Sequence, residues 1–417
     1  MKQFVLIDSV PDLKDNLTTK EKRLMGGRVT DKVYPDDACV VEEAVRLKNK
    51  HGGKVTALFL GEEDTEHPHC KAQDLGADET VWLKRENGHE DVFSTASIIS
   101  EYLKEEEVDL ILTGSDVWGA MIAELLEIPS VTRVLDVDIQ RGNAVLKMEG
   151  EEEWIKTSFP FLISTLPQVG EAESPSMEKS GKAVQTTGVK VDHCLKGEHS
   201  DRMDACGVST SHGSHLTVRN ILVVGEIQEN QLEPLSYEAI AAAGKMVGDG
   251  EITAVLMGKE VHNFSNEMMA YGADGVLEIH HPLLENGTPD SYAQSLYKVL
   301  SEHSFEGVVF PDSPFGRVLA ARVAVRMRSG LMTGVTDIKR QDEGIVFTTS
   351  SHQRKRFGKK INHGPMGVFT ITPGRFFPCI KEERQGWKCV VEMEIENLRM
   401  ERVDVKNLSH EYERAGV

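Results

Sequence analysis

The sequence predicts an α/β fold with two homologous, doubly wound, mostly parallel-sheet (Rossmann-like) domains related by a pseudo-twofold repeat. Three observations support this prediction: an internal repeat, a regular alternation of strand and helix patterns, and a length of 417 residues, which exceeds what one hydrophobic core normally serves. The repeat is clearest where residues 109–119 (DLILTGSDVWG) resemble residues 307–316 (GVVFPDSPFG). Each copy predicts a buried strand, a short loop of small residues and then a helix.

Other landmarks of the repeat follow in the same order and at a nearly constant separation. The matching pairs are 55–61 with 252–258, 75–78 with 271–274, Gly119 with Gly316, and Thr132 and Asp136 with Thr333 and Asp337. Several landmarks in register indicate two homologous domains in one polypeptide. We expect a first domain over residues 1–175, a linker over 176–217, a second domain over 218–378 and a C-terminal tail over 379–417.

In the first half, short apolar runs predict strands, and apolar residues at helical spacing predict helices. The expected strands are 2–8, 55–61, 81–83 and 108–113, and the expected helices are 34–50, 65–75, 92–105 and 119–126. The polar stretch from the first strand to residue 33 predicts a long loop or an irregular hairpin. Pro160 interrupts the apolar run 155–166, which predicts strands at the edge of the sheet rather than in its core.

Residues 176–217 are rich in Lys, Ser, Gly and His and indicate a linker that is in part mobile. The second half then repeats the strand and helix pattern. Its expected strands are 220–226, 252–258 and 308–310, and its expected helices are 237–247, 289–300 and 318–327. Alternating runs after residue 344 predict further strands on one of the sheets. Strands alternating with helices predict parallel sheets covered on both faces.

The composition narrows the class of protein. The net charge is −20, from 67 acidic and 47 basic residues, so the chain repels a phosphate backbone and we expect no nucleic-acid partner. The sequence has no apolar run of 18 residues and no basic-then-apolar leader, so we expect a cytoplasmic protein that does not enter a membrane. Six cysteines without CxxC spacing indicate reduced thiols.

Residues 34–47 (YPDDACVVEEAVRL) resemble the signature near the start of the β subunit of the electron-transfer flavoproteins, and 76–78, 109–114 and 123–126 continue the match in order. The second half is similar to the N-terminal domain of the α subunit, at 221–226, 311–316 and 336–338. Residues 368–373 (VFTITP) resemble the strand that precedes the flavin domain of that family. The resemblance covers most of residues 1–175 and 218–375 and implies a fused β-subunit and α-subunit relative.

The resemblance implies an electron carrier rather than a substrate-transforming enzyme. It would hold one adenine-containing cofactor, FAD or AMP, and pass electrons to or from a partner oxidoreductase or dehydrogenase. Three departures from the family pattern stand out. Residues 379–417 are too few for the α-subunit FAD domain, the phosphate-wrapping β-subunit loop is reduced to residues 115–118, and the partner-recognition loop survives only weakly at 168–182.

Ligands of open parallel sheets bind beyond the carboxyl ends of the strands, where loop amides and helix N-termini meet anions. The candidates for an adenine-nucleotide site in the first half are Ser9, Val10, Leu60, Gly61, Thr113, Gly114, Ser115, Asp116 and Gly119. Those in the second half are Ser313, Gly316 and Arg317. We expect Arg317 to meet a phosphate. The alternative, equally weighted, is that the glycines of the first loop merely turn strand into helix.

Other cationic residues are interpreted as structural. Arg322 and Arg326 lie four apart and predict a solvated helix face, and the basic run 352–360 predicts an exposed hairpin rather than a grip on a diphosphate or an acidic partner. The His and Cys groups at 67–70 and 193–215 lack the spacing of zinc sites, so we expect no metal. Trp118 is interpreted as a packing residue, like Phe315 at the matching position.

A second hypothesis is a non-redox nucleotide-binding or scaffolding protein that has lost the flavin domain. A third is that a separate polypeptide supplies that domain. The sequence leaves open whether a flavin is bound, which of the two loops holds the ligand, the electron donor and acceptor, and the oligomeric state.

Overall fold

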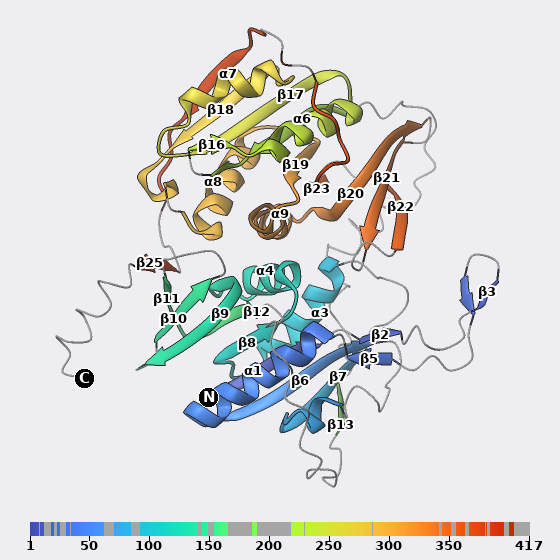
Figure 1. Ribbon diagram of the computed structural model, residues 1–417, viewed down its shortest axis with the longest axis vertical. Helices are drawn as coiled ribbons and strands as arrows, with labels where there is room; N and C mark the ends of the chain where they lie inside the picture. Colours follow the sequence, from blue (N-terminus) through green and yellow to red (C-terminus); the bar gives the residue numbers. More distant parts are fainter. Residues whose placement is uncertain are drawn as a thin grey trace, which may run out of the picture. The chain divides into compact units, whose positions relative to one another are not determined.

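The computed structural model describes a defined part of the chain. The described residues are 1–7, 9–11, 18–20, 23–25, 31–33, 35–61, 71–84, 92–140, 143–148, 154–165, 186–189, 218–228, 230–285, 287–341, 344–351, 356–362, 367–379, 381, 384–395 and 400–403. The chain divides into two compact units, residues 1–194 with 399–417 and residues 195–398. Each unit contains one large, mostly parallel sheet (Figure 1), which confirms the predicted α/β class.

The first unit has a ten-stranded sheet in the order β13-β7-β6-β1-β8-β12-β9-β10-β11-β25. Its parallel strands are β1 (Lys2–Ile7), β6 (Lys54–Gly61), β7 (Glu79–Lys84), β8 (Leu110–Thr113), β12 (Phe161–Thr165), β13 (Thr186–Val189) and the first part of β9 (Ser130–Gln140). Antiparallel β10 (Asn143–Met148), β11 (Trp154–Ser158) and β25 (Glu401–Val403) extend one side.

Helices cover both faces of this sheet, and the alternation of side chains along β1 shows which helix covers which face. Val5 packs in one core with Val41 and Leu47 of α1 (Pro35–His51). The neighbouring Phe4 points to the other face, where its ring meets Tyr102 of α3 (Val92–Lys104) edge to face at 6.4 Å. Helix α4 (Asp116–Leu125) packs against α3, β8, β9 and β12.

The second unit has a nine-stranded sheet, which runs β24-β18-β17-β14-β19-β23-β20-β21-β22. Its strands are β14 (Val218–Gly225), β17 (Val247–Gly258), β18 (Gly275–His280), β19 (Gly307–Pro311), β20 (Gly330–Gln341), β21 (Gly344–Ser351), β22 (Arg356–Asn362), β23 (Gly367–Ile371) and β24 (Trp387–Val391). The helices are α6 (Pro234–Met246), α7 (His262–Ala270), α8 (Pro289–Glu302) and α9 (Pro314–Arg326).

The two sheets repeat one topology strand for strand. Beginning at β13 in one and β24 in the other, nine strands follow in the same order of chain appearance, with the same parallel and antiparallel pairings. In the first sheet the chain forms β1, β6 and β7 in succession in one direction and then returns to add β8 on the other side of β1. In the second sheet it forms β14, β17 and β18 and then adds β19 on the other side of β14. Those two places are topological switch points, where open α/β sheets bind ligands.

Two parts of the fold differ from the sequence expectations. Strand β12 is not an edge strand: it is buried and lies between β8 and β9 in the middle of the sheet. The expectation was wrong because Pro160 precedes the first strand residue, Phe161, and so removes no hydrogen bond from the ladder. In addition, Thr186–Val189, within the expected linker, pairs with β7.

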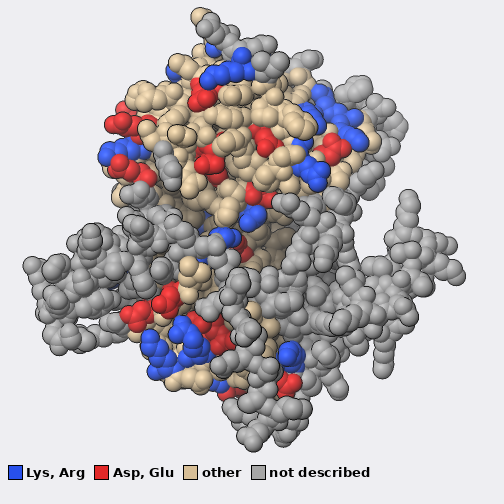
Figure 2. Space-filling view, in the orientation of Figure 1, with Lys and Arg blue, Asp and Glu red and all other residues tan. Residues whose placement is uncertain are grey.

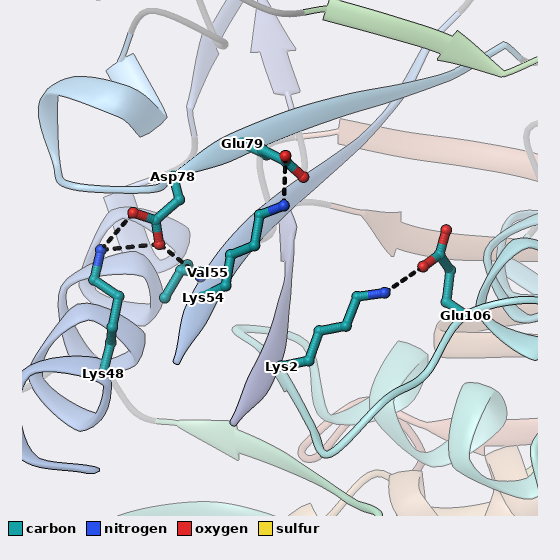
Figure 3. Close-up of polar contacts among 7 residues, drawn as sticks. All are labelled: Lys2, Lys48, Lys54, Val55, Asp78, Glu79 and Glu106. Atoms are coloured by element: carbon teal, nitrogen blue, oxygen red, sulfur yellow. Dashed lines mark hydrogen bonds and ion pairs between the residues drawn. The ribbon is translucent and has the colours of Figure 1, made fainter. Parts of the chain in front are cut away.

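The Gly-Ala-Asp landmarks close the N-terminal edge of both sheets. The Asp78 carboxylate accepts hydrogen bonds from the Val55 amide, at 2.9 Å, and from Lys48 Nζ of α1, at 3.0 Å (Figure 3). In the second unit the Asp274 carboxylate accepts from the Ile252 amide at 2.9 Å. Gly76 and Gly272, with φ of 108° and 122°, provide the left-handed turns that bring these carboxylates to the strand. The repeated triplet is therefore structural.

Replacing Asp78 by Ala should lower the free energy of unfolding by about 1 kcal/mol, because the Val55 amide loses its acceptor. Asp274→Ala should have a similar effect in the second unit, and Asp74→Ala, at an exposed position, should have little. Urea denaturation followed by circular dichroism would measure all three. Equal stabilities of the Asp78 and Asp74 variants would contradict the structural role.

Candidate functional site

The first loop (residues 113–119) lies at the C-terminal edge of the first sheet, where β8 ends and α4 begins. Ser115 is the N-cap of α4: its hydroxyl accepts from the Trp118 amide at 3.3 Å, and its own amide donates to the Thr113 hydroxyl at 3.1 Å. Gly114 lies between the last strand residue, Thr113, and the N-cap, Ser115. The loop therefore presents the N-terminus of a helix at the switch point, an arrangement that favours anions.

A short hydrogen-bonded chain ties this loop to the neighbouring strands. The Ser164 hydroxyl of β12 donates to the Asp116 carboxylate and accepts from the Arg133 amide of β9 at 3.0 Å. Arg133 lies in a β-bulge, where two residues of β9 face one residue of β12. Asp116 is thus held by Ser164 in the first turn of α4.

The structure places the other first-half candidates at the same edge but gives them different roles. Ser9 and Val10 form a short strand, β2 (Ser9–Pro11), directly after β1, paired with β5 (Asp31–Val33). Leu60 and Gly61 end β6 beside β1. A Cβ atom on Gly119 would lie 2.8 Å from Leu162 Cδ2, so this glycine lets α4 pack closely on β12.

The second loop (residues 311–316) has the same design with an added carboxylate. Ser313 caps α9 by accepting from the Gly316 amide at 2.8 Å, and its hydroxyl donates to Glu226 Oε1 at 2.6 Å. Glu226 directly follows β14. A Cβ atom on Gly316 would lie 2.1 Å from the Pro311 carbonyl oxygen and 2.8 Å from Glu226 Oε1. Gly316 is therefore required by close packing, and Glu226 occupies the space beside the α9 N-terminus.

Burial raises the pKa of Glu226 to about 7. The hydrogen bond from Ser313 acts in the opposite direction, and the nearby carboxylates of Glu233 and Asp312 raise the pKa further. A carboxyl group with such a pKa is partly protonated at neutral pH. The second loop thus disfavours additional negative charge.

Arg317 contacts a carboxylate of its own loop. It is the fourth residue of α9, its amide donates to the Ser313 carbonyl, and its guanidinium contacts the Asp312 carbonyl at 3.4 Å and carboxylate at 3.7 Å. Asp312 also accepts from the Thr370 hydroxyl at 2.7 Å, and Thr370 accepts from the Gly334 amide at 2.9 Å. The same hydrogen-bonded chain of amide, hydroxyl and carboxylate occurs at both loops. In the first loop the carboxylate, Asp116, follows the capping serine, and in the second loop the carboxylate, Asp312, precedes it.

Arg322 and Arg326 do not form a solvated face, so that expectation was wrong. Arg322 is fully buried and lies 3.7 Å from the Asp290 carboxylate of α8, and Arg326 approaches the same carboxylate at 2.7 Å. The prediction that both arginines lie on one helix face is correct. That face packs against α8, whose Asp290 supplies the counter-charge. The sequence pattern of one helix does not show which helix packs against it.

The remaining expectations concern the basic run 352–360 and the groups of His and Cys residues, and some of these residues lie outside the described ranges. Arg356–Asn362 pairs with Gly344–Ser351 as an antiparallel hairpin, as predicted, whereas 352–355 lie outside the described residues. The His and Cys groups at 67–70 and 193–215 also lie outside them. Within the described ranges, no three His, Cys, Asp or Glu side chains are grouped as a metal site, and Cys39, Cys379 and Cys389 form no disulfide.

The face of the molecule drawn in Figure 2 has mixed charge. On this face the described acidic and basic side chains lie next to one another rather than in separate areas (Figure 2). Among the helices of the described segments, none is both long and apolar enough to cross a membrane.

Four residues at the two loops were missed by sequence reasoning: Ser164, Thr370, Glu226 and Arg133. Ser164 and Thr370 are the next-to-last residues of β12 and β23, and the order of the strands in the sheet brings them to the loops although they are far from the loops in sequence. Glu226 carried a usable signal, because it is an acidic residue directly after an apolar strand of the repeat. Arg133 carried none, because the bulge that holds it is not visible in the periodicity.

Comparison with known proteins identifies relatives of both halves. A model of the electron transfer flavoprotein domain matches residues 27–191 and 221–397. Among curated proteins, the chain is 31% identical over 182 residues to the electron transfer flavoprotein subunit alpha of Bacillus subtilis, covering 43% of this chain and 56% of that protein. It is 30% identical over 194 residues to subunit beta of the same organism, covering 44% of this chain and 76% of that protein.

A third relative is the acryloyl-CoA reductase electron transfer subunit beta of Anaerotignum propionicum, at 32% identity over 183 residues, 40% of this chain and 50% of that protein. The chain thus spans little more than half the length of the alpha subunit it matches.

Replacing Asp290 by Asn should lower the free energy of unfolding by about 3 kcal/mol, because the buried Arg322 loses its counter-charge. Glu285→Gln removes an exposed partner of Lys259 and should leave the urea midpoint nearly unchanged. Fluorescence-monitored urea titrations would compare the two variants. An Asp290 variant as stable as the Glu285 variant would show that Arg322 does not depend on Asp290 as its counter-charge.

Replacing Glu226 by Gln should change how stability depends on pH. The folded pKa of about 7 lies above the ordinary value of 4.5, so the native state binds this proton more tightly and loses stability as pH rises through about 7. The loss amounts to at most about 3 kcal/mol. The variant should melt at the wild-type temperature near pH 5 and above it near pH 8, as measured by differential scanning calorimetry. Glu101→Gln, at an exposed position of α3, should follow the wild type throughout.

Proposed function

The chain belongs to the electron transfer flavoprotein family, with segments similar to both subunits in one polypeptide, and from this we propose that it is an electron-transfer component. In this proposal it binds one adenine-containing cofactor, FAD or AMP, and exchanges electrons with a partner oxidoreductase or dehydrogenase. The observation that carries the proposal is the pair of family matches, over residues 27–191 and 221–397, on two sheets of identical topology.

The residues at the first loop fit a phosphate-bearing ligand. The α4 N-terminus opens at a switch point, Gly114 allows a close backbone approach, and the Asp116 carboxylate already accepts from Ser164. Ser9 and Val10 follow the neighbouring strand β1, on the other side of the switch point. We assign the cofactor to this loop.

The second loop fits such a ligand less well. Glu226 fills the space beside the α9 N-terminus, and Asp312 already engages Arg317. Ser313, Gly316 and Arg317 therefore act in our proposal as structural residues. This is also the reason for proposing one nucleotide per chain rather than two.

A bound flavin would supply the redox chemistry, and the residues of the chain would bind and orient it. Thr113, Ser115 and the amides of α4 would hold the phosphate side of the ligand by hydrogen bonds. The buried strands behind them exclude water from the sheet side of the loop. The alternative is a non-redox nucleotide-binding or scaffolding protein with the same loop, which these contacts would serve equally well.

The absorbance spectrum of the freshly purified chain tests the proposal. We expect the absorbance bands of an oxidised flavin, or their appearance after incubation with FAD, since a bound flavin carries the chemistry of such carriers. Mass spectrometry of the denatured extract should then identify FAD. AMP without flavin would favour the non-redox alternative.

Co-purification from the native source tests the partner. A separately encoded polypeptide that brings the flavin would appear with the chain and would restore the bands when added back. Neither bands nor a nucleotide, alone or with co-purified partners, would refute the proposal.

A further inference from the structure

Strand β24 is the last strand on one side of the second sheet, next to β18 (Figure 1). It pairs with β18 in parallel over its whole length, Trp387–Val391, and among the described strands none lies on its other side. Residues 387–390 are all exposed, and Val390 exposes 58% of its surface. An exposed edge of this kind is a template for pairing with another strand.

The hydrogen bonds to β18 show which backbone groups of β24 are directed away from the sheet. The Trp387 amide donates to the carbonyl of Asp274, the residue before β18, at 3.3 Å. Because the backbone groups of successive strand residues alternate in direction, those of Lys388 and Val390 are directed away from β18. The outer edge therefore offers amides and carbonyls to a further strand.

The side chains at this edge carry charges of both signs around an apolar centre. Side chains of a strand alternate between the two faces of the sheet, so Lys388 and Val390 project to the same face. Glu392 directly follows the strand and takes the next position of that alternation. Lys388 and Glu392 are both exposed, and they lie at equal separation in sequence from Val390.

This order of side chains is complementary to itself. When two β24 strands pair in antiparallel fashion with Val390 opposite Val390, Lys388 of each copy lies opposite Glu392 of the other. The outward backbone groups of the two valines then form a hydrogen-bonded pair. Opposite charges directly across an antiparallel pair stabilise it, and the two exposed valines lose surface to each other.

An exposed lysine can also protect an edge strand from pairing. A pairing centred on Cys389 would have this result, because it places Lys388 opposite Val390 and gives the ammonium group no carboxylate. The pairing centred on Val390 gives each Lys388 a counter-charge. It is also isologous, so it closes after two copies and does not propagate into a fibre.

We propose that the outer edge of β24 is an interaction surface for a second copy of this chain, which adds its own β24 as an antiparallel strand centred on Val390. The proposal is independent of the cofactor, because β24 lies outside the two loops of the candidate site. Two strands of five residues each bury less area than a stable dimer interface. The dimer should therefore be weak and depend on concentration.

Sedimentation velocity of the full chain tests the proposal. The wild type should change from monomer to dimer between about 1 and about 100 µM, as expected of a weak interface. A salt concentration of about 0.15 M screens the repulsion between two chains of net charge −20. Lys388→Glu and Glu392→Lys should each weaken the dimer at least about 10-fold, because each places like charges opposite one another at two positions. The double variant should restore the wild-type affinity to within about threefold.

Lys104→Glu is the matched control, because it makes the same change of charge at an exposed position of α3, in the first unit. It should dimerise like the wild type. A chain that stays monomeric at every concentration would overturn the proposal and leave the edge to a different partner. A dimer whose affinity does not respond to the charge exchange would place the contact elsewhere and overturn it as well.

Disulfide crosslinking tests the register of the two strands. Val390→Cys, made together with Cys389→Ser, should form a crosslinked dimer on mild oxidation, because opposing residues of a hydrogen-bonded antiparallel pair have Cα atoms about 5.5 Å apart. Peptide mass spectrometry would locate the bond. A crosslink between the native Cys389 residues of two wild-type chains would overturn the pairing centred on Val390.

Discussion

Both sheets depend on one hydrogen-bonded connection at the C-terminal edge. A hydroxyl on a central strand, Ser164 or Thr370, accepts from the amide of a bulged residue and donates to a carboxylate at the start of a helix. The partly buried carboxylate and the bulged amide are polar groups that cost free energy unless they are paired. The connection satisfies both and fixes where the helix begins relative to the strand order. The loops at the switch points can therefore be short.

At the opposite edge of each sheet, an aspartate carboxylate, that of Asp78 or Asp274, accepts a hydrogen bond from the amide of a neighbouring strand. This difference between the two edges is a reason to propose a ligand site at the C-terminal edge. All parallel strands of a unit end at the same edge, so the groups that face a ligand gather at that edge only. The Gly-Ala-Asp repeat, the most conspicuous motif of the sequence, thus contributes to stability, and the less conspicuous loops carry the site that we propose.

The repeat could be predicted from the sequence because it rests on local patterns: apolar strands, helix spacing and short landmarks in register. Strand order could not, since β12 reaches the centre of its sheet only through pairing with β8 and β9. The same limit hid Ser164, which is far from the first loop in sequence. It also misplaced Arg322, whose environment is set by Asp290 on the neighbouring helix. The secondary structure of a residue could be predicted from its own segment. Its environment could not be predicted where a strand or helix distant in sequence packs against it.

The two loops show how a duplicated framework can specialise without changing its topology. The second copy has the unstrained Gly334 at its bulge and the internal carboxyl of Glu226 beside its helix, so it is complete without a ligand. The first copy retains a strained arginine at the same bulge. Strain that a glycine would remove lowers the stability of the protein. The two copies therefore keep the same hydrogen-bonded connection at a different conformational cost, which is higher at Arg133 than at Gly334.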